Sequence, residues 1–78
     1  MDKKFGTLKI RVRKEDSAYV YCILESHEGI VSYSTLDHET GSPFRDLELQ
    51  VPPAFASELT EVLDLMRTQG VDIYELSA

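Results

Sequence analysis

Four residues near the start of the chain have the side chains to bind an anion. Arg13, Lys14, Asp16 and Ser17 lie where an alternating segment ends and a helical pattern begins. Backbone N–H groups at a helix start attract anions, and a neighbouring Arg or Lys adds positive charge. The sequence therefore predicts a binding site here for a small anionic metabolite that carries a carboxylate or a phosphate. The alternative is an ordinary helix cap.

The two histidines, His27 and His38, each have acidic neighbours in the sequence. Histidine and carboxylate side chains together can bind a divalent metal ion. A whole predicted strand separates the two histidines, at about 3.3 Å per residue, so they cannot share one ion within a protomer. We expect both to be surface histidines in turns, and the sequence predicts no metal site and no cofactor.

Cys22 is the single cysteine of the chain. A nucleophilic thiol needs a base that lowers its pKa, and no histidine occupies a neighbouring helical position. Cys22 also sits in an apolar run, so we expect it to be a small buried core residue. The sequence also has no Gly-rich phosphate loop, no Cys-x-x-Cys pair and no Ser-His-Asp order.

Four tyrosines, Tyr19, Tyr21, Tyr33 and Tyr74, are many for this chain length. If Tyr33 and Tyr74 point outward, they stand on two edge strands of an open sheet. Exposed aromatic side chains suit a protein partner, or stacked bases in an RRM-like domain. The RRM alternative needs aromatic residues on central strands, where this sequence has Lys, Arg, Asp and Glu. Core packing is the other interpretation of any one tyrosine.

Three segments have the patterns of β-strands. Residues 7–13 alternate polar and apolar, and so do residues 44–51, while residues 30–36 are β-branched and aromatic. Residues 37–43 between the last two are turn formers, with Gly41 able to adopt a positive φ. They predict a hairpin. The expected core-facing residues are Leu8, Ile10 and Val12 in the first strand and Leu47, Leu49 and Val51 in the last. The facing of residues 30–36 is open, because Val31, Tyr33 and Thr35 compete with Ile30, Ser32, Ser34 and Leu36.

The clearest helix spans residues 53–69. Proline fits a first helical turn, an apolar stripe follows at i, i+4, i+7, i+8 and i+11, and Gly70 is the expected stop. The stripe consists of Phe55, Leu59, Val62, Leu63 and Met66. Residues 71–76 then predict a short strand with Val71 and Ile73 on one face.

Residues 16–27 allow two interpretations. Asp16 or Ser17 suits an N-cap, Val20, Ile23, Leu24 and His27 follow at helical spacing, and Gly29 is a stop signal. Residues 19–23 are nevertheless β-prone, which would give a five-stranded meander with one helix. We choose the helix, because residues 7–13 and 30–36 then become the two arms of a crossover unit.

The resulting order over residues 1–78 is β-α-β-β-α-β. It predicts one α+β domain, a ferredoxin-like sandwich with a four-stranded antiparallel sheet and two helices on one face. Strands 7–13 and 44–51 are then the middle pair. Their outward residues, basic on the first strand and acidic or polar on the second, should pair across the open face of the sheet, which is the face away from the helices. These residues are Lys9, Arg11 and Arg13, and Asp46, Glu48 and Gln50.

Charge and length restrict the partners. A net charge of −6 repels a phosphate backbone, so we expect no nucleic-acid binding. No apolar run approaches the roughly 18 residues that span a bilayer, and the first residues lack the apolar run of a signal peptide. We therefore expect no membrane association and a cytoplasmic location. A chain of 78 residues builds a small core, so we expect a homodimer.

Residues 26–35, the hairpin after them and the helix at 53–69 resemble the ACT-like small-molecule regulatory modules of the ferredoxin-like class. A closer resemblance is to a family of short bacterial proteins of unknown function. It is carried by Glu28-Gly29 after the first helix, Thr35-Leu36-Asp37 at a strand end and the proline that opens the second helix. The resemblance to ACT modules implies an amino-acid site where the first strand meets the first helix, usually beside a glycine in that turn. Here that turn is Arg13-Lys14-Glu15-Asp16.

These observations favour a non-catalytic small regulatory or ligand-sensing module. The alternative is a protein-interaction adaptor that acts through the exposed sheet or the edge strand 30–36. A third hypothesis is a small enzyme resembling the acylphosphatases, which use an arginine in the first strand–helix loop together with an asparagine. The sequence contains no asparagine, and we expect the protein not to be an enzyme.

Overall fold

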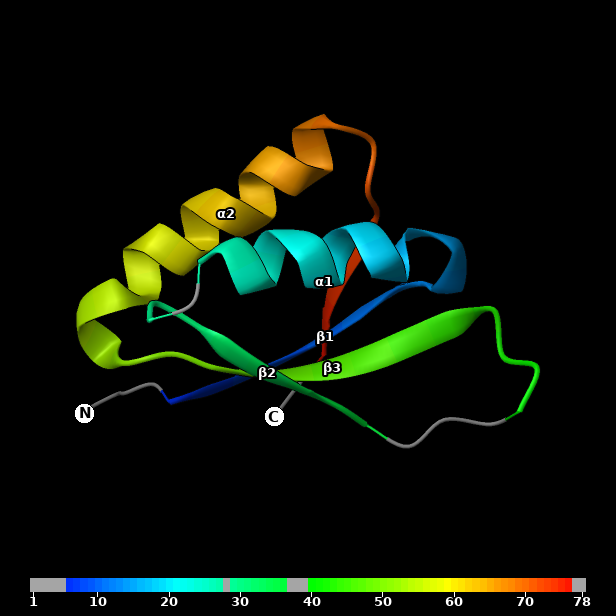
Figure 1. The fold of residues 1–78 in the computed structure, drawn as a ribbon, viewed down its shortest axis with the longest axis horizontal. Helices are drawn as coiled ribbons and strands as arrows, with labels where there is room; N and C mark the ends of the chain where they lie inside the picture. The colour runs from blue at the N-terminus through cyan, green and yellow to red at the C-terminus, as the bar shows by residue number, and fades with distance from the viewer. Residues whose placement is uncertain (1–5, 28, 37–39, 77–78) are drawn as a thin grey trace.

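The computed structural model describes residues 6–27, 29–36 and 40–76. Two layers are visible in Figure 1, a sheet and, against one of its faces, a pair of helices. A 3-10 turn precedes each helix, at Lys14–Asp16 and at Pro53–Phe55. The elements in chain order are β1 (Thr7–Arg13), α1 (Ser17–Ser26), β2 (Ser32–Thr35), β3 (Phe44–Gln50), α2 (Ala56–Thr68) and β4 (Ile73–Leu76).

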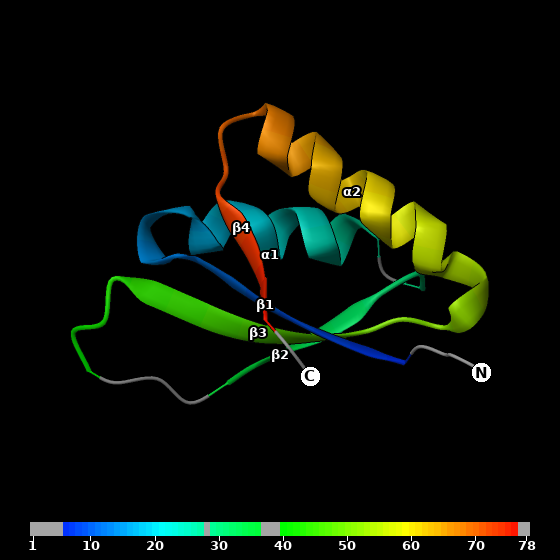
Figure 2. The same ribbon diagram turned by 180° about the vertical axis from the view of Figure 1, so that it is seen from behind.

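The sheet has the strand order β2-β3-β1-β4, and every neighbouring pair is antiparallel. The strands β1 and β3 form the middle pair, in register from Thr7 opposite Gln50 to Arg13 opposite Phe44. Both helices lie on the same face of this sheet in the two opposite views of Figures 1 and 2. The predicted ferredoxin-like βαββαβ arrangement is confirmed.

The core lies between the sheet and the helices. Alternation sends every second residue of a strand to one face, and Ile10, Val12, Leu47 and Leu49 on the middle strands are completely buried. The helices contribute Val20, Leu24, Leu59, Val62, Leu63 and Met66, the segments beside the strands contribute Val31, Val51 and Val71, and β4 contributes Ile73. Leu8 is half-buried against this cluster.

Phe55 is an exception to the predicted apolar stripe, because its side chain is 37% exposed. The expected helix at 53–69 begins as a 3-10 turn over Pro53–Phe55, and the α-helix starts only at Ala56. A 3-10 turn advances by about 3.0 residues per turn instead of 3.6. Phe55 therefore falls out of phase with Leu59 and the rest of the stripe.

The helical interpretation of residues 16–27 is confirmed, with Val20 and Leu24 buried. Asp16 occupies the N-cap position but makes no side-chain cap hydrogen bond, and the Ser17 hydroxyl donates to the Lys14 carbonyl at 2.8 Å. The prediction for Cys22 is wrong, since its side chain is exposed. Cys22 lies two residues from both Val20 and Leu24, about 200° around the helix from each.

The burial of individual side chains shows which face of β2 is turned toward the core. Val31 is buried and Tyr33 is half-buried, whereas Ser32 and Ser34 are exposed. The regular strand is shorter than the expected 30–36. Gly41 and Gly70 both adopt a positive φ, at 86° and 94°, as expected for the hairpin turn and for the stop of α2.

Candidate functional site

The residues of the predicted anion site lie together where β1 meets α1. Arg13 ends β1, Lys14 and Asp16 form the 3-10 turn, and Ser17 begins α1. The Arg13 guanidinium forms an ion pair with Asp72 at 3.2 Å, and the Ser17 hydroxyl is bonded to the Lys14 carbonyl. The structure thus collects the four residues, and the side chains of Arg13 and Ser17 already have protein partners.

The open face of the sheet shows the expected charge pairing at one position. Arg11 binds Asp46 through two parallel bonds, Nε to Oδ1 at 2.8 Å and Nη2 to Oδ2 at 3.1 Å. The hydrogen bond to Asp46 and the charge of that carboxylate raise the pKa of Arg11. The guanidinium also lies over the Phe44 ring, 5.7 Å from its centroid. Arg11 is therefore a structural residue of the open face.

The two edge tyrosines do not share a face. Tyr74 on β4 is opposite Arg11 and 50% exposed, so it stands on the open face. Tyr33 on β2 is opposite the buried Leu49, and its side chain packs against the core. The outward placement of both tyrosines, which the aromatic-surface hypothesis needed, holds for Tyr74 alone.

A hollow of about 380 Å³ lies between α1 and β2. It is lined by Leu24, Glu25, Val31, Ser32 and Tyr33, and we call it the α1–β2 hollow. Leu24 and Val31 are buried core residues, at 1% and 5% exposure. The hollow therefore has apolar surface at its base and a carboxylate at its rim.

Tyr33 is held in place by two residues of α1. Its hydroxyl donates to Glu25 Oε2 at 2.8 Å, and its ring stacks on Tyr21 with centroids 5.3 Å apart and planes 4° from parallel. Tyr21 and Glu25 are four residues apart, so they project from the same side of the helix. The same two contacts tie the edge strand β2 to α1.

The hydrogen bond to Glu25, together with burial and the charge of that carboxylate, raises the pKa of Tyr33 from 10.0 to about 12. We predict that Glu25→Ala returns this pKa toward 10.0, because it removes both the acceptor and the charge. A raised pKa in the folded state contributes stability that is complete below about pH 10 and is lost as the pH rises through 12.

The measurement is a pH titration of protein labelled with ¹³C at tyrosine Cζ. The Tyr33→Phe variant assigns the resonance, and Tyr19→Phe serves as the control that should leave it unmoved. A Tyr33 midpoint that is the same in the native protein and in Glu25→Ala would contradict the assignment of the hydrogen bond as the main cause.

The sequence-based reasoning did not find the α1–β2 hollow. The signal was present as Tyr21 and Glu25 at i, i+4, together with Val31 and Tyr33 at alternate strand positions. Either pair alone is common in packed domains. They indicate a site only when α1 and β2 are known to present these sides to each other.

Of the two histidines, the structure describes His27. The Nδ1 of His27 lies 2.9 Å from the Ile23 carbonyl oxygen, and a carbonyl can only accept, so Nδ1 carries the proton. His38 lies outside the described residues. Within residues 6–27, 29–36 and 40–76, no three or more His, Cys, Asp or Glu side chains form a group that could hold a metal ion.

Among the described helices, none combines the length and the apolar character needed to cross a membrane. No curated protein and no solved structure matches the chain.

One protein family does match. The model of a domain of unknown function, DUF4911, covers residues 10–69, from β1 to just beyond α2 and therefore more than half of the chain. The predicted membership of a family of unknown function is confirmed. The chain belongs to the DUF4911 family.

Proposed function

We propose that this protein is a non-catalytic regulatory module that senses a small molecule, as its resemblance to ACT-like modules implies. The observation that carries the proposal is the α1–β2 hollow of about 380 Å³. Small-molecule sites typically measure about 300–1,000 Å³ and combine apolar walls with a few placed polar groups. Leu24 and Val31 supply the apolar base, and the bonded pair of Tyr33 and Glu25 supplies the polar groups.

The hollow fits this role better than the β1–α1 junction. At the junction, Arg13 is paired with Asp72 and Ser17 is bonded to the Lys14 carbonyl, so a ligand would compete with existing contacts. In the hollow, a ligand gains apolar contact without breaking a hydrogen bond. The experiment below therefore tests separately whether an anionic metabolite binds at Arg13, Lys14, Asp16 and Ser17.

The position of the hollow also supports a regulatory role. The strand β2 has four residues, lies at the edge of the sheet and is hydrogen-bonded to β3 as its neighbour. Short edge elements open at lower free-energy cost than the centre of a sheet. A ligand that contacts both α1 and β2 would therefore order this edge and change what it presents to a partner.

The proposal is tested by a thermal-shift screen of amino acids, nucleotides, phosphorylated metabolites, amines and divalent metal ions. A ligand at 100 times its Kd stabilises the folded state by about 2.7 kcal/mol. We expect a dose-dependent shift that is lost in Tyr33→Ala, which removes a wall of the hollow, and kept in Arg13→Ala and Lys14→Ala. The reverse pattern would place the site at the junction, and a flat screen would contradict ligand sensing.

A second candidate function is a protein-interaction adaptor that works through the edge of β2. The Leu36 N–H donates to the Asp46 carbonyl at 2.9 Å. Antiparallel pairing alternates, so the backbone groups of Tyr33 and Thr35 point away from β3 to the free edge. The strand Ser32–Thr35 has no charged residue and no proline to discourage another strand from adding there.

An added strand would come from a partner protein or from β2 of a second copy, which would make the homodimer expected from the chain length. Thr35→Pro removes an outward N–H and no bond of the β2–β3 ladder. We expect this variant to stay folded and to lose the dimer in light scattering. A native protein that is monomeric at micromolar concentration would contradict the dimer.

A further inference from the structure

We propose that the α1–β2 hollow selects a small molecule in which a protonated amine is attached to an apolar or aromatic body. This inference rests on the proposed ligand-sensing function and names the chemical class of the ligand. It differs from the small anionic metabolite that the junction residues predict, both in the site and in the sign of the charge.

Among the described lining residues, Glu25 carries the charged group, a carboxylate. An ionised carboxylate only accepts hydrogen bonds, and its two oxygens offer about four acceptor positions. Oε2 accepts the bond from the Tyr33 hydroxyl at 2.8 Å. Among the described residues, no cationic side chain forms an ion pair with Glu25. Oε1 is therefore the acceptor to which a ligand ammonium would donate.

The surroundings of this carboxylate suit a cation with an apolar body. Leu24 and Val31 form the base of the hollow, and the stacked pair of Tyr33 and Tyr21 stiffens its wall. An ammonium group at Glu25 lets the hydrocarbon or ring of the ligand cover this apolar surface. A short-range ion pair and apolar contact then act on the same molecule.

The same charges disfavour anionic ligands in the hollow. Neither Lys, Arg nor His is among the described lining residues, and the whole chain carries a net charge of −6. A carboxylate or phosphate placed beside Glu25 would meet like charge, and no described lining residue would supply a counter-ion. Simple alkyl amines keep their proton at neutral pH, as the reference pKa of about 10.4 for a lysine side chain indicates.

The test compares three phenyl compounds that differ in charge, together with an alkyl amine that lacks the ring. The probes are 2-phenylethylamine, n-hexylamine, 2-phenylethanol and phenylacetate, and the Kd of each is measured by ¹⁵N–¹H NMR titration of the native protein. We expect the two amines to bind, with shifted amides around Glu25 and Tyr33, and to bind about fivefold more tightly than the alcohol, because an ion pair at the exposed Glu25 carboxylate is weak. Phenylacetate should not bind, and amine binding should weaken as salt is added.

Two variants assign the selectivity to Glu25. Glu25→Gln removes the charge and keeps the shape, and it should weaken amine binding about fivefold. Glu15→Gln removes one exposed negative charge from the 3-10 turn before α1, and it should leave the Kd unchanged. Equal weakening by both variants would show a general charge effect and overturn the inference.

The remaining outcomes separate the inference from the function on which it rests. If the alcohol or phenylacetate binds as tightly as the amines and Tyr33→Ala abolishes this binding, the hollow is a ligand site without amine selectivity. The amine inference then fails and the sensing function stands. If neither amine binds, the inference fails, and the general screen alone decides on sensing.

Discussion

Leu47→Ala is expected to lower the free energy of unfolding by about 3 kcal/mol, within the range of about 2–5 kcal/mol for truncating a buried leucine. Leu47 is 0% exposed and lies on the middle strand β3, opposite Ile10 on one side and Thr35 on the other. The surrounding backbone is held by ladders on both sides, so the cavity cannot collapse easily. The truncation therefore costs both the transfer free energy of the lost atoms and the cavity they leave.

The effect is large for a domain of this size. Stability of about 0.05–0.15 kcal/mol per residue gives roughly 4–12 kcal/mol for 78 residues. The measurement is urea denaturation followed by circular dichroism, with the midpoint and slope fitted for each variant. A substantial part of the Leu47→Ala population should be unfolded at 37 °C if the native protein lies at the lower end.

The matched control is Leu65→Ala, the same change on α2 at a side chain that is 51% exposed. Surface substitutions of this kind usually change stability by less than about 0.5 kcal/mol. If the two alanine variants lost the same free energy, the assignment of Leu47 to the core and Leu65 to the surface would be wrong.

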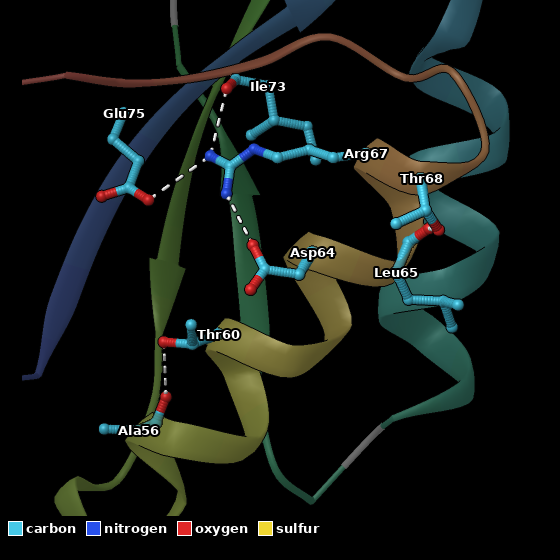
Figure 3. Close-up of polar contacts among 8 residues, drawn as sticks. All are labelled: Ala56, Thr60, Asp64, Leu65, Arg67, Thr68, Ile73 and Glu75. Carbon is cyan, nitrogen blue, oxygen red and sulfur yellow. Dashed lines mark hydrogen bonds and ion pairs between the residues drawn. The ribbon is translucent and has the colours of Figure 1, made fainter.

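Arg67→Ala is expected to lower the free energy of unfolding by about 1–2 kcal/mol. This arginine joins the last turn of α2 to β4, as Figure 3 shows. Its Nη1 donates to Asp64 Oδ1 at 3.1 Å, and its Nη2 donates to the Ile73 carbonyl at 3.1 Å and to Glu75 Oε2 at 3.4 Å.

Arg67→Ala removes two kinds of contact, exposed ion pairs and a hydrogen bond to a backbone carbonyl. Ion pairs at exposed positions contribute little, about 0–1 kcal/mol, and both Asp64 and Glu75 are more than half exposed. A hydrogen bond from a charged group to the carbonyl of the buried Ile73 is worth more, about 1.5–3 kcal/mol before the exposure of the arginine is discounted. The Arg67 side chain is 34% exposed, so the bond to Ile73 is expected to supply most of the loss.

Two variants separate these contacts. Asp64→Asn removes the helical i, i+3 pair alone and should cost a few tenths of a kcal/mol. Arg67→Lys keeps the charge but not the planar fork that reaches three acceptors, so it should fall between Asp64→Asn and Arg67→Ala. Denaturant unfolding gives the free energies, and hydrogen exchange of the β4 amides should accelerate in Arg67→Ala. Equal losses in Asp64→Asn and Arg67→Ala would contradict the role of the Ile73 bond.

Local periodicity was enough to predict most of the architecture. Alternation in residues 7–13 and 44–51 predicted both middle strands and their core residues, because a strand sends successive side chains to opposite faces whatever it pairs with. The stripe at Leu59, Val62, Leu63 and Met66 predicted α2 for the equivalent reason in a helix. The right-handed crossover rule then placed these elements in the observed order.

Predictions about individual side chains were less secure, because they depend on phase. A shift to 3-10 geometry at Pro53–Phe55 exposed Phe55, and the rotation of α1 that buries Val20 and Leu24 turned Cys22 to solvent. An apolar sequence neighbourhood, which suggested a buried cysteine, does not reveal which side of a helix faces the sheet.

The sequence by itself determined the elements, their order and the basic and acidic stripes of the two middle strands, since each follows from the pattern within a strand or helix. The register of β1 and β3, known only from the structure, decided that Arg11 pairs with Asp46. Only the tertiary structure decided which way β2 faces, and this orientation decided where the candidate site forms. Residues 30–36 carry apolar side chains on both faces, so their pattern does not show which face is buried. Packing against α1 decides this. That choice brought Tyr33 onto Tyr21 and Glu25, and it formed the α1–β2 hollow from two segments that no local pattern connects.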